Sequence, residues 1–585
     1  MATQGSRLLL WITALGLVIV AAVAVAVVLL LDAKPPGLST EPQWLHAKVS
    51  GSLSDAPTSG SMLADPSDMP PLTTELTAAI RHAATDEAVE GLLLEVRPAD
   101  VGWAQLQEIR SALQDFQDAG KPCMAWADAF SNKEYYLATA CGEVHAPPTA
   151  ITLVNGLSVT RSYYAEAFER YGVSANFEHV GDFKTAVEPY ERTGPSEAAQ
   201  EASGAMLDSL YGQLISGIAD GRRVTVEKAQ GWLDDPPLTA QAAFDRGMLD
   251  GLSYREDVTE SLIEGDLLTM GSYLQDLRRE WNRGTARIAV LHAEGAIVGG
   301  SSDQDVFGSA YVGDRTLVRQ LKEIREDEDI AAVVLRVNSP GGSGSASDAI
   351  WNAVRLTREE KPVVVSMGDY AASGGYYISM GSDWIVAEPG TLTGSIGVFG
   401  GKLNFAGALE EFGIYSHTEQ RGPYASMLSS MSDFDEQERA KFREFLSGFY
   451  DVFVAKAAEG RSMTPEELHA VAQGRVWTGE QALERGLVDE LGGLEVALAK
   501  ARELAELESD AGIVRYPERK SFVDQLLEEL AGEGEAAAAS QLLSSTHPEL
   551  GLSASARQTL GDLEALNRSL DGGVAALVPG ALRVE

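Results

Sequence analysis

A serine followed by two glycines stands where a predicted strand runs into a predicted helix. The segment VVVSMGDYAASGGYYISMGS, which begins at Val363, places Ser373 among small residues at this turn. Such a bend would hold the serine hydroxyl out from the backbone. The N–H of Gly374 and the positive end of the helix would then face a developing oxyanion. This arrangement favours nucleophilic catalysis, in which the serine needs a base to accept its proton.

A second glycine pair follows another apolar strand-like run. The sequence NSPGGSGSASD comes directly after IAAVVLRV, and its glycines are Gly341 and Gly342. Glycine lets the backbone bring its N–H groups close to a ligand. A Pro-Gly-Gly sequence is also an ordinary turn, but in the same unit as Ser373 the pair is a candidate for the other oxyanion donor.

The sequence contains an internal repeat of one unit. Tyr135 matches Tyr376 and Gly181 matches Gly422, and the members of each pair are 241 residues apart. Further on the offset becomes 239, as RGMLDGL at 246 and RGLVDEL at 485 show. Chance matches do not hold one register over some 50 residues, so we interpret the chain as an internal duplication.

The two copies differ where catalysis needs particular side chains. Asn132 stands in the position of Ser373, and a lysine and a glutamate replace the two glycines after it. Conversely Lys184, in GDFKTAVEPYE, has Ala425 as its counterpart. This complementary loss predicts a single site assembled from both halves, with Ser373 as nucleophile and Lys184 as general base.

A lysine acts as a base only when it is neutral. For Lys184 near pH 7 to 8 this requires a pKa lowered by about 2–3 units, or about 3–4 kcal/mol. Burial in an apolar cleft between the units would supply this shift, whereas most lysines are solvated surface residues. The second half also holds His292, His417 and His469. None lies in a motif, and a serine protease with His417 as its base is the alternative.

Strand-like and helix-like segments alternate in both copies. The apolar runs EGLLLEV near 90 and IAAVVLRV near 330 are each followed by a helical pattern and then by another apolar run. This alternation predicts an α/β fold with a largely parallel sheet in each unit. We expect the following division: N-terminus 1–7, apolar helix 8–31, linker and start of the first unit 32–75, first unit 45–255, connecting segment 256–286, second unit 287–505 and acidic helical tail 506–585.

Residues 8–31 carry no charge and would form a helix of about 36 Å, long enough to span a bilayer. The flanking charges favour a cytoplasmic N-terminus, so that everything after residue 35 lies outside. A cleaved signal peptide is the alternative.

The composition excludes other classes of protein. A net charge of −40 argues against nucleic acid and against broad contact with anionic lipid. Cys123 and Cys141 lie in no CxxC pair, which leaves zinc and thioredoxin-like chemistry without support. We expect the two cysteines to be buried free thiols rather than a disulfide.

Three blocks agree in order and spacing with one known family. GDFKTAVEPYERTGPSEAAQE, the SPGG at 339 and DYAASGGYYISMGSDWIVAEPGTLTGSIGVFG resemble the long, duplicated form of bacterial signal peptide peptidase A, or protease IV. The resemblance covers about residues 40–505. It implies tandem ClpP/crotonase-like domains preceded by one transmembrane helix, and a serine–lysine dyad of Ser373 and Lys184.

The resemblance also implies a biological setting. It predicts a bowl-shaped homotetramer on the outer face of the bacterial cytoplasmic membrane that digests signal peptides left there after preprotein processing, without metal or cofactor. A crotonase-like acyl-CoA-binding enzyme and a non-enzymatic membrane scaffold are alternatives. Whether Ser373 and Lys184 of one site come from one chain or from two stays open at this level.

Overall fold

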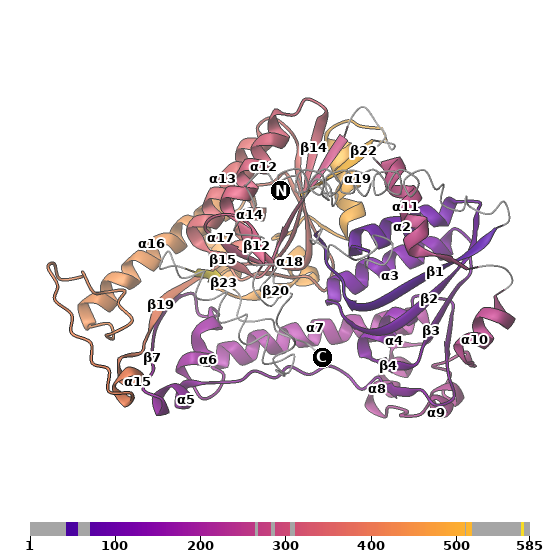
Figure 1. Ribbon diagram of the computed structural model, residues 1–585, viewed down its shortest axis with the longest axis horizontal. Helices are drawn as coiled ribbons and strands as arrows, with labels where there is room; N and C mark the ends of the chain where they lie inside the picture. The colour runs from indigo at the N-terminus through magenta and orange to yellow at the C-terminus, as the bar shows by residue number, and fades with distance from the viewer. Residues whose placement is uncertain are drawn as a thin grey trace, which may run out of the picture.

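The computed structural model describes residues 42–56, 71–263, 267–281, 287–304, 310–508, 511–517 and 575–577. The predicted membrane helix at 8–31 lies outside these ranges. Within them, no helix is both long and apolar enough to cross a membrane. Two α/β units lie side by side, and the long helix α7 (Glu197–Gly221) runs beneath them (Figure 1).

The first unit is built on a six-stranded sheet of parallel pairs, in the order β8-β5-β3-β2-β1-β9. The strands are β1 (Gln43–Ser52), β2 (Val89–Asp100), β3 (Cys123–Ala127), β5 (Glu143–Ala146), β8 (Gly251–Leu252) and β9 (Leu267–Thr269). Its helices are α2 (Thr73–Thr85), α3 (Trp103–Asp118), α4 (Asn132–Ala138), α5 (Ala165–Arg170), α6 (Glu188–Glu191), α7, α8 (Val226–Asp234), α9 (Ala240–Asp245), α10 (Arg255–Asp257) and α11 (Met270–Trp281).

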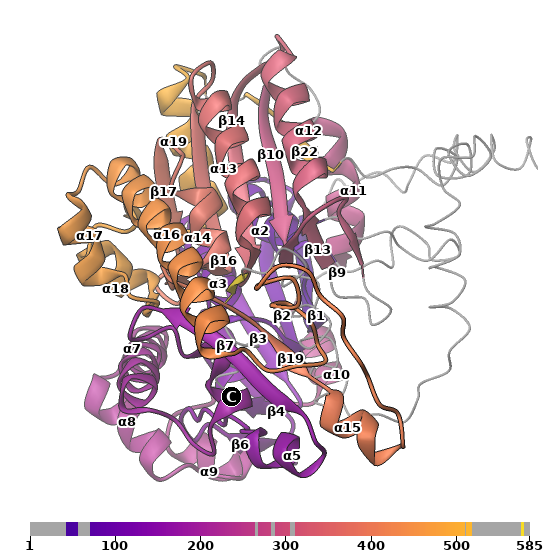
Figure 2. The ribbon, with the colours of Figure 1, turned by 90° about the vertical axis from the view of Figure 1, so that its left-hand side faces the viewer.

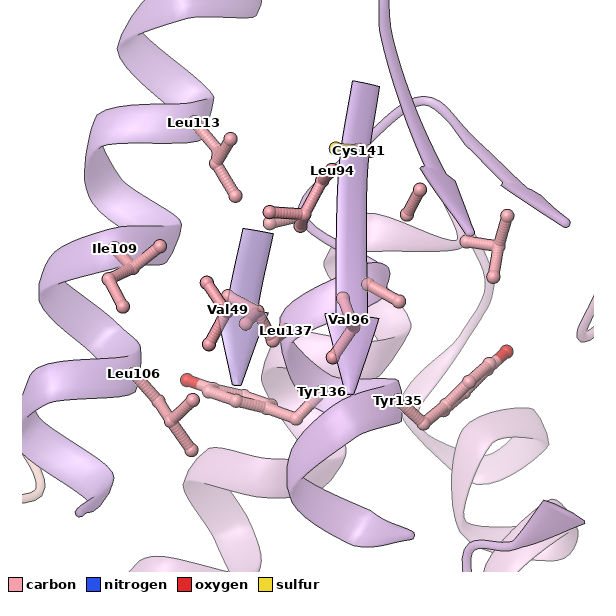
Figure 3. Close-up of a cluster of buried hydrophobic side chains, with 14 of the residues drawn as sticks. Val49, Leu94, Val96, Leu106, Ile109, Leu113, Tyr135, Tyr136, Leu137 and Cys141 are labelled. Carbon is pink, nitrogen blue, oxygen red and sulfur yellow. The ribbon is translucent and has the colours of Figure 1, made fainter. Parts of the chain in front are cut away.

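Apolar periodicity explains why these elements pack as they do. The central strands are buried on both faces, as the continuous apolar run in β2 predicts. Figure 3 shows one side of this core, where Leu106, Ile109 and Leu113 of α3 point toward Val49 and Leu94 of the strands. Helix α3 presents these side chains on one face because they recur at intervals of three and four residues.

The second unit repeats this plan with an eight-stranded sheet. Its path is β20-β18-β16-β14-β10-β22, and β17 and β21 continue from β16. The strands are β10 (Arg287–Glu294), β14 (Ile330–Ser339), β16 (Val363–Ala372), β17 (Trp384–Ala387), β18 (Leu392–Gly394), β20 (Val476–Thr478), β21 (Glu490–Leu491) and β22 (Gly512–Tyr516). The helices are α12 (Asp314–Glu326), α13 (Gly344–Arg358), α14 (Gly374–Ser379), α15 (Ala406–Glu411), α16 (Glu436–Gly460), α17 (Pro465–Val471), α18 (Gly479–Glu484) and α19 (Leu494–Leu504).

Equivalent elements recur at the offsets read from the sequence. Strands β5 and β17 are 241 residues apart, and helices α7 and α16 are 239 apart. The tandem duplication of an α/β unit is therefore confirmed in the fold.

A third, seven-stranded sheet joins the units, in the order β12-β13-β11-β15-β23-β19-β7. Strand β7 (Ser174–Val180) of the first unit pairs antiparallel with β19 (Val398–Asn404) of the second over seven residues, and the two run side by side in Figure 2. The remaining strands are β11 (Ala296–Val298), β12 (Asp303–Gln304), β13 (Ala310–Gly313), β15 (Gly341–Ser343) and β23 (Ala575–Leu577), while β4 (Ala129–Ser131) and β6 (Ile151–Leu153) form a separate pair.

One sequence-based prediction is wrong, and another lies mostly outside the described residues. The tail predicted to be helical at 506–585 is described only at 506–508, 511–517 and 575–577, which include strands β22 and β23. Strand β22 has the β-branched and aromatic side chains that suit a sheet, and it extends the second sheet beside β10. The cysteines are not free thiols, because Cys123 and Cys141 form a disulfide. The chain returns to the start of β3 after α4, where the Gly142 N–H donates to the Cys123 carbonyl.

A buried ion network fixes the units against each other. Arg336 of β14 donates to Asp55 at 3.1 Å and to Glu108 at 2.7 Å, and both carboxylates come from the first unit. All three side chains are 1% exposed. The guanidinium also donates to Ser366 Oγ at 2.8 Å. Because charges this deep are costly unless paired, the network requires the two units to be aligned.

Removal of the arginine should therefore unfold the chain readily. We expect Arg336→Met to lower the free energy of unfolding by about 3–5 kcal/mol, because Asp55 and Glu108 stay buried without their cation. The midpoint of urea unfolding, followed by circular dichroism, measures this change. The matched control is Arg358→Met, which breaks an exposed pair with Asp383 and should cost about 0–1 kcal/mol. Equal stability of the two variants would contradict the prediction.

Candidate active site

Ser373 occupies a strained turn at the end of β16 and directly before α14. Its φ of 56° lies in the left-handed region, which is uncommon for a residue other than glycine. The Ser373 N–H donates to the Gly394 carbonyl at 2.8 Å, and the Tyr377 N–H donates to the Ser373 carbonyl at 2.8 Å. The side chain is fully buried. The backbone is thus held by hydrogen bonds on both sides of the turn.

The glycine pair lies directly against this turn. A Cβ atom on Gly374 would stand 3.0 Å from the Gly342 nitrogen and 3.1 Å from the Gly341 Cα. Gly341 and Gly342 have φ angles of 107° and 155°, which favour glycine. The Gly341 N–H donates to Ser339 Oγ at 3.2 Å, so Gly342 is the better placed of the two to serve as a donor beside Gly374.

Lys184 approaches Ser373 from the other unit of the same chain. Its Nζ lies 2.7 Å from Ser373 Oγ, within hydrogen-bond distance. The ammonium nitrogen also lies 3.0 Å from both the carbonyl oxygen and the Oγ of Ser395. The two residues that the duplication singled out, 189 positions apart, therefore meet within one chain.

Close backbone packing buries the lysine. The side chain passes Gly397, where a Cβ would stand 3.2 Å from Lys184 Cδ, and Gly474 lies against the lysine backbone. The Phe183 N–H donates to the Gln473 carbonyl at 2.8 Å and anchors this segment to the second unit. Lys184 is 1% exposed, and burial lowers its pKa from 10.5 to about 7. A large fraction of the amine is thus neutral at pH 7 and able to accept a proton.

Ser395 is a functional candidate that the sequence reasoning missed. It is buried, its φ is 50°, and its N–H donates to the Arg475 carbonyl at 2.7 Å. Its oxygens hold the lysine amine in front of Ser373. Comparison of the two copies could have revealed Ser395. The residue 241 positions earlier is Val154, whose side chain has no hydrogen-bonding group.

The histidines take no part in this arrangement. Among the described residues, no histidine hydrogen-bonds to Ser373. His417 is exposed, and His469 hydrogen-bonds to the Tyr450 hydroxyl. His292 is buried and has a pKa lowered to about 3, chiefly by burial.

Strand β23 lies beside the glycine pair. Its residues Ala575–Leu577 pair antiparallel with β15, with Ala576 opposite Gly342 and Leu577 opposite Gly341. Ala575 also pairs with Phe399 of β19. An extended apolar segment thus adds as a strand next to Gly342. A cavity is lined by Lys184, Ser395, Phe183, Met206, Val476 and Arg161.

Comparison with known proteins shows the family of this chain. The model of peptidase family S49 matches residues 115–268 and 355–508, and that of Clp protease matches 310–385. The chain belongs to peptidase family S49. The S49 model matches once in each half, so the S49 unit itself is duplicated. The prediction of a serine peptidase is confirmed at the level of the family.

Curated relatives extend over most of the chain. "Serine protease SPPA, chloroplastic" of Arabidopsis thaliana is 33% identical over 437 residues, which cover 73% of this chain and 64% of that protein. "Protease 4" of Salmonella typhi is 34% identical over 478 residues, covering 78% and 76%. "Putative signal peptide peptidase SppA" of Enterococcus faecium is 36% identical over 231 residues, covering 39% and 67%.

The counterparts of Ser373 and Lys184 in the other copies, Asn132 and Ala425, form no second dyad. Asn132, in the position of Ser373, accepts hydrogen bonds from the N–H groups of Asn155 and Gly156 and donates to the Gly156 carbonyl. Its amide is therefore engaged with its own loop. Ala425, in the position of Lys184, offers no base. The sequence predicted that this position had lost its catalytic serine. In the structure, the Asn132 side chain instead hydrogen-bonds to the loop at Asn155 and Gly156.

Alanine at position 374 should damage this S49 site. The new Cβ would stand 2.7 Å from Ser347 Oγ and 3.0 Å from the Gly342 nitrogen, so the turn must shift. We expect Gly374→Ala to slow labelling of Ser373 by a fluorophosphonate by about 10- to 100-fold, the range that loss of an oxyanion donor begins to reach. Gly194→Ala, where the Cβ meets no atom within 4 Å, is the control and should label at the normal rate. Equal labelling of both variants would show that this close packing is unimportant.

Proposed function

We propose that this chain is a membrane-anchored serine endopeptidase that works through a dyad of Ser373 and Lys184. The observation that carries the proposal is the 2.7 Å contact between the buried amine of Lys184 and the hydroxyl of Ser373. A neutral lysine in this position is a base within reach of the proton it must remove.

The mechanism follows from these contacts. Ser373 Oγ attacks the peptide carbonyl while Lys184 takes its proton, and the oxyanion receives N–H donors from Gly374 and Gly342. Lys184 then protonates the leaving amine, and a water molecule is activated by the same lysine to release the acyl group. Ser395 orients the amine through both steps. No step in this scheme calls for a metal or a cofactor.

The proposed substrates are apolar peptides, and signal peptides in particular. Strand β23 supports binding in an extended form, because Ala-Ala-Leu pairs with β15 as a substrate strand would. The name of the Enterococcus faecium relative describes a putative signal peptide peptidase, and we extend this substrate class to the present chain.

The proposed setting is the bacterial cytoplasmic membrane, with a single span at 8–31 and the catalytic part on the extracytoplasmic side. The uncharged apolar segment supports the anchor. The Cys123–Cys141 disulfide supports an oxidising compartment. We propose that the base is supplied by the unit at 45–255 and the nucleophile by the unit at 287–505, with β9 extending the first sheet and β22 the second beyond these bounds. We also propose that four chains assemble into a homotetramer.

The alternatives account for fewer of these contacts. An acyl-CoA-binding enzyme would use the glycine N–H groups but has no need for a buried lysine beside Ser373. A Ser–His protease would need a histidine next to the hydroxyl, and His417 is exposed instead. A scaffold without activity leaves the strained serine turn unexplained.

The pH dependence of peptidase activity tests the role of Lys184. Because burial lowers the pKa of this lysine to about 7, the base is protonated and inactive below that pH. We expect kcat/KM for an apolar peptide to rise about tenfold per unit below pH 7 and to level off above it. Lys184→Ala should lower kcat/KM by about 10²–10⁴-fold, while His417→Ala should change neither rate nor midpoint. A midpoint above pH 9 would contradict the proposal.

Mixing experiments test whether each dyad lies within one chain. Lys184 and Ser373 meet within one chain, so chains carrying Lys184→Ala and chains carrying Ser373→Ala cannot complement each other. We expect the mixture, after dissociation and reassembly, to show only the residual activity of the separate variants. In a parallel control, a mixture of wild-type and Ser373→Ala chains should keep the activity expected from the fraction of wild-type chains in it. Recovered activity in the first mixture would mean that sites form between chains.

A further inference from the structure

Arg161 is a cation of the catalytic cavity that the dyad mechanism does not use. It lines this cavity together with Lys184 and Ser395. Its guanidinium forms no ion pair and no hydrogen bond with the part of the chain that the structure describes. By contrast Arg475, whose carbonyl accepts the Ser395 N–H, forms an ion pair with Glu201. The charge of Arg161 therefore has no counterion among the described residues.

The loop that carries Arg161 is held at both ends. Before it, the Asn155 N–H donates to Asn132 Oδ1 at 3.0 Å. After it, the Tyr164 N–H donates to the Pro189 carbonyl at 2.6 Å, and Pro189 lies in α6, which follows the catalytic lysine closely in the sequence. Arg161 is half-buried. A guanidinium on a fixed loop loses less freedom when it binds a ligand, which favours binding.

The lining of the cavity is positive although the chain is strongly negative. The net charge of the chain is −40, yet no aspartate or glutamate lines the cavity, whose basic residues are Arg161 and Lys184. Burial lowers the pKa of Lys184 to about 7, and the lysine acts as a base only when it is neutral. Arginine stays protonated throughout this pH range. Arg161 is therefore the permanent charge of the cavity, and it attracts anionic groups.

Apolar side chains form much of the remaining wall. Phe183, Met206 and Val476 line the cavity, so a single charged group stands among apolar surfaces. Ligand pockets are commonly built in this way, with a few polar groups that fix the orientation of the ligand. A guanidinium matches the two oxygens of a carboxylate with two parallel N–H donors. The cavity thus suits an apolar peptide that carries a carboxylate.

The counterpart of Arg161 in the second unit has a different setting. Lys402 stands 241 positions later, in β19. It is buried, and its Nζ lies 4.6 Å from the centre of the Phe434 ring. Packing against an aromatic ring accounts for the cation at this position. Among the described residues Arg161 has no such ring contact, so its charge is available for a ligand.

We propose that Arg161 binds a carboxylate of the peptide substrate and thereby selects which peptides reach Ser373 and Lys184. The carboxylate is either the free C-terminus of the peptide or the side chain of an acidic residue, since both present the same two oxygens to a guanidinium. This inference rests on the proposed peptidase function. It adds a charged group to a substrate class that was defined above by apolar side chains.

Matched peptides test the preference for a carboxylate and identify its source. Each contains Ala-Ala-Leu, the sequence of β23, followed by alanines. One pair ends in a free carboxylate or in an amide. The second set consists of amides in which glutamate or glutamine replaces each later alanine in turn. We expect the wild-type chain to prefer the charged member of one pair by about tenfold in kcat/KM, mainly through KM, because a hydrogen bond to a charged group contributes this much. Equal rates within every pair would overturn the proposal.

Substitution of the arginine should remove this preference. Arg161→Gln should lower kcat/KM for the charged peptide about tenfold, to the value of its neutral partner, and leave kcat and the pH midpoint unchanged. Arg161→Glu should turn the preference toward the neutral peptide. The matched control is Arg170→Gln, an exposed arginine nine positions further along that does not line the cavity, and it should keep the wild-type preference. A preference that persists in Arg161→Gln would contradict the assignment.

Peptide binding separates this inference from the proposed function. Fluorescence anisotropy of the labelled peptides is measured with the full-length Ser373→Ala chain and with the Ser373→Ala, Arg161→Gln chain. We expect the charged peptide to bind the first chain about tenfold more tightly than its neutral partner, and both peptides to bind the second chain equally. A wild-type chain that cleaves none of the peptides would contradict the peptidase function, whereas equal binding of charged and neutral peptides to Ser373→Ala would overturn the role of Arg161.

Discussion

The burial of one lysine amine against one serine hydroxyl is the constraint on which this structure depends. An ammonium group at that depth is unfavourable, so the pKa of Lys184 falls to about 7 and the group becomes a usable base. The burial depends on backbone that packs without side chains, at Gly397 and Gly474, both in the second unit. The first unit supplies the lysine and the second supplies the environment that changes its chemistry.

Because Lys184 and Ser373 come from different units, the contact between them depends on the alignment of the two units. Lys184 follows β7 of the first unit and Ser373 follows β16 of the second, and an error of about 1 Å in their relative position would break the contact between them. Two features oppose such a shift. The buried network around Arg336 holds β14 against Asp55 and Glu108 of the first unit, and the β7–β19 ladder ties the segment before Lys184 to the segment after Ser395.

Duplication followed by complementary loss accounts for the composition of the candidate site. Asn132 and Ala425 stand where the other copy carries Ser373 and Lys184, and neither side chain can serve as a nucleophile or a base. The pairing of β7 with β19 in turn joins the two units, with the strand before Lys184 on one side and the strand after Ser395 on the other.

Much of this protein could be predicted from its sequence alone. The constant offset of 241 residues revealed the tandem α/β units, and the mismatches Asn132 and Ala425 singled out Ser373 and Lys184. Such inferences succeed because equivalent positions of the two copies can be compared. A side chain that is present in one copy and absent from the other is needed only once. The same comparison held a signal for Ser395, opposite Val154, but a serine in an apolar loop has no distinctive neighbours in the sequence.

Only the tertiary structure decided which groups meet and in what environment. It brought Lys184 to 2.7 Å from Ser373 within one chain, favoured Gly342 over Gly341 as donor, and joined Cys123 to Cys141. It also placed strands β22 and β23 within the segment after residue 505. These outcomes depend on burial and on pairing between residues far apart in the chain. Local sequence determines neither of them.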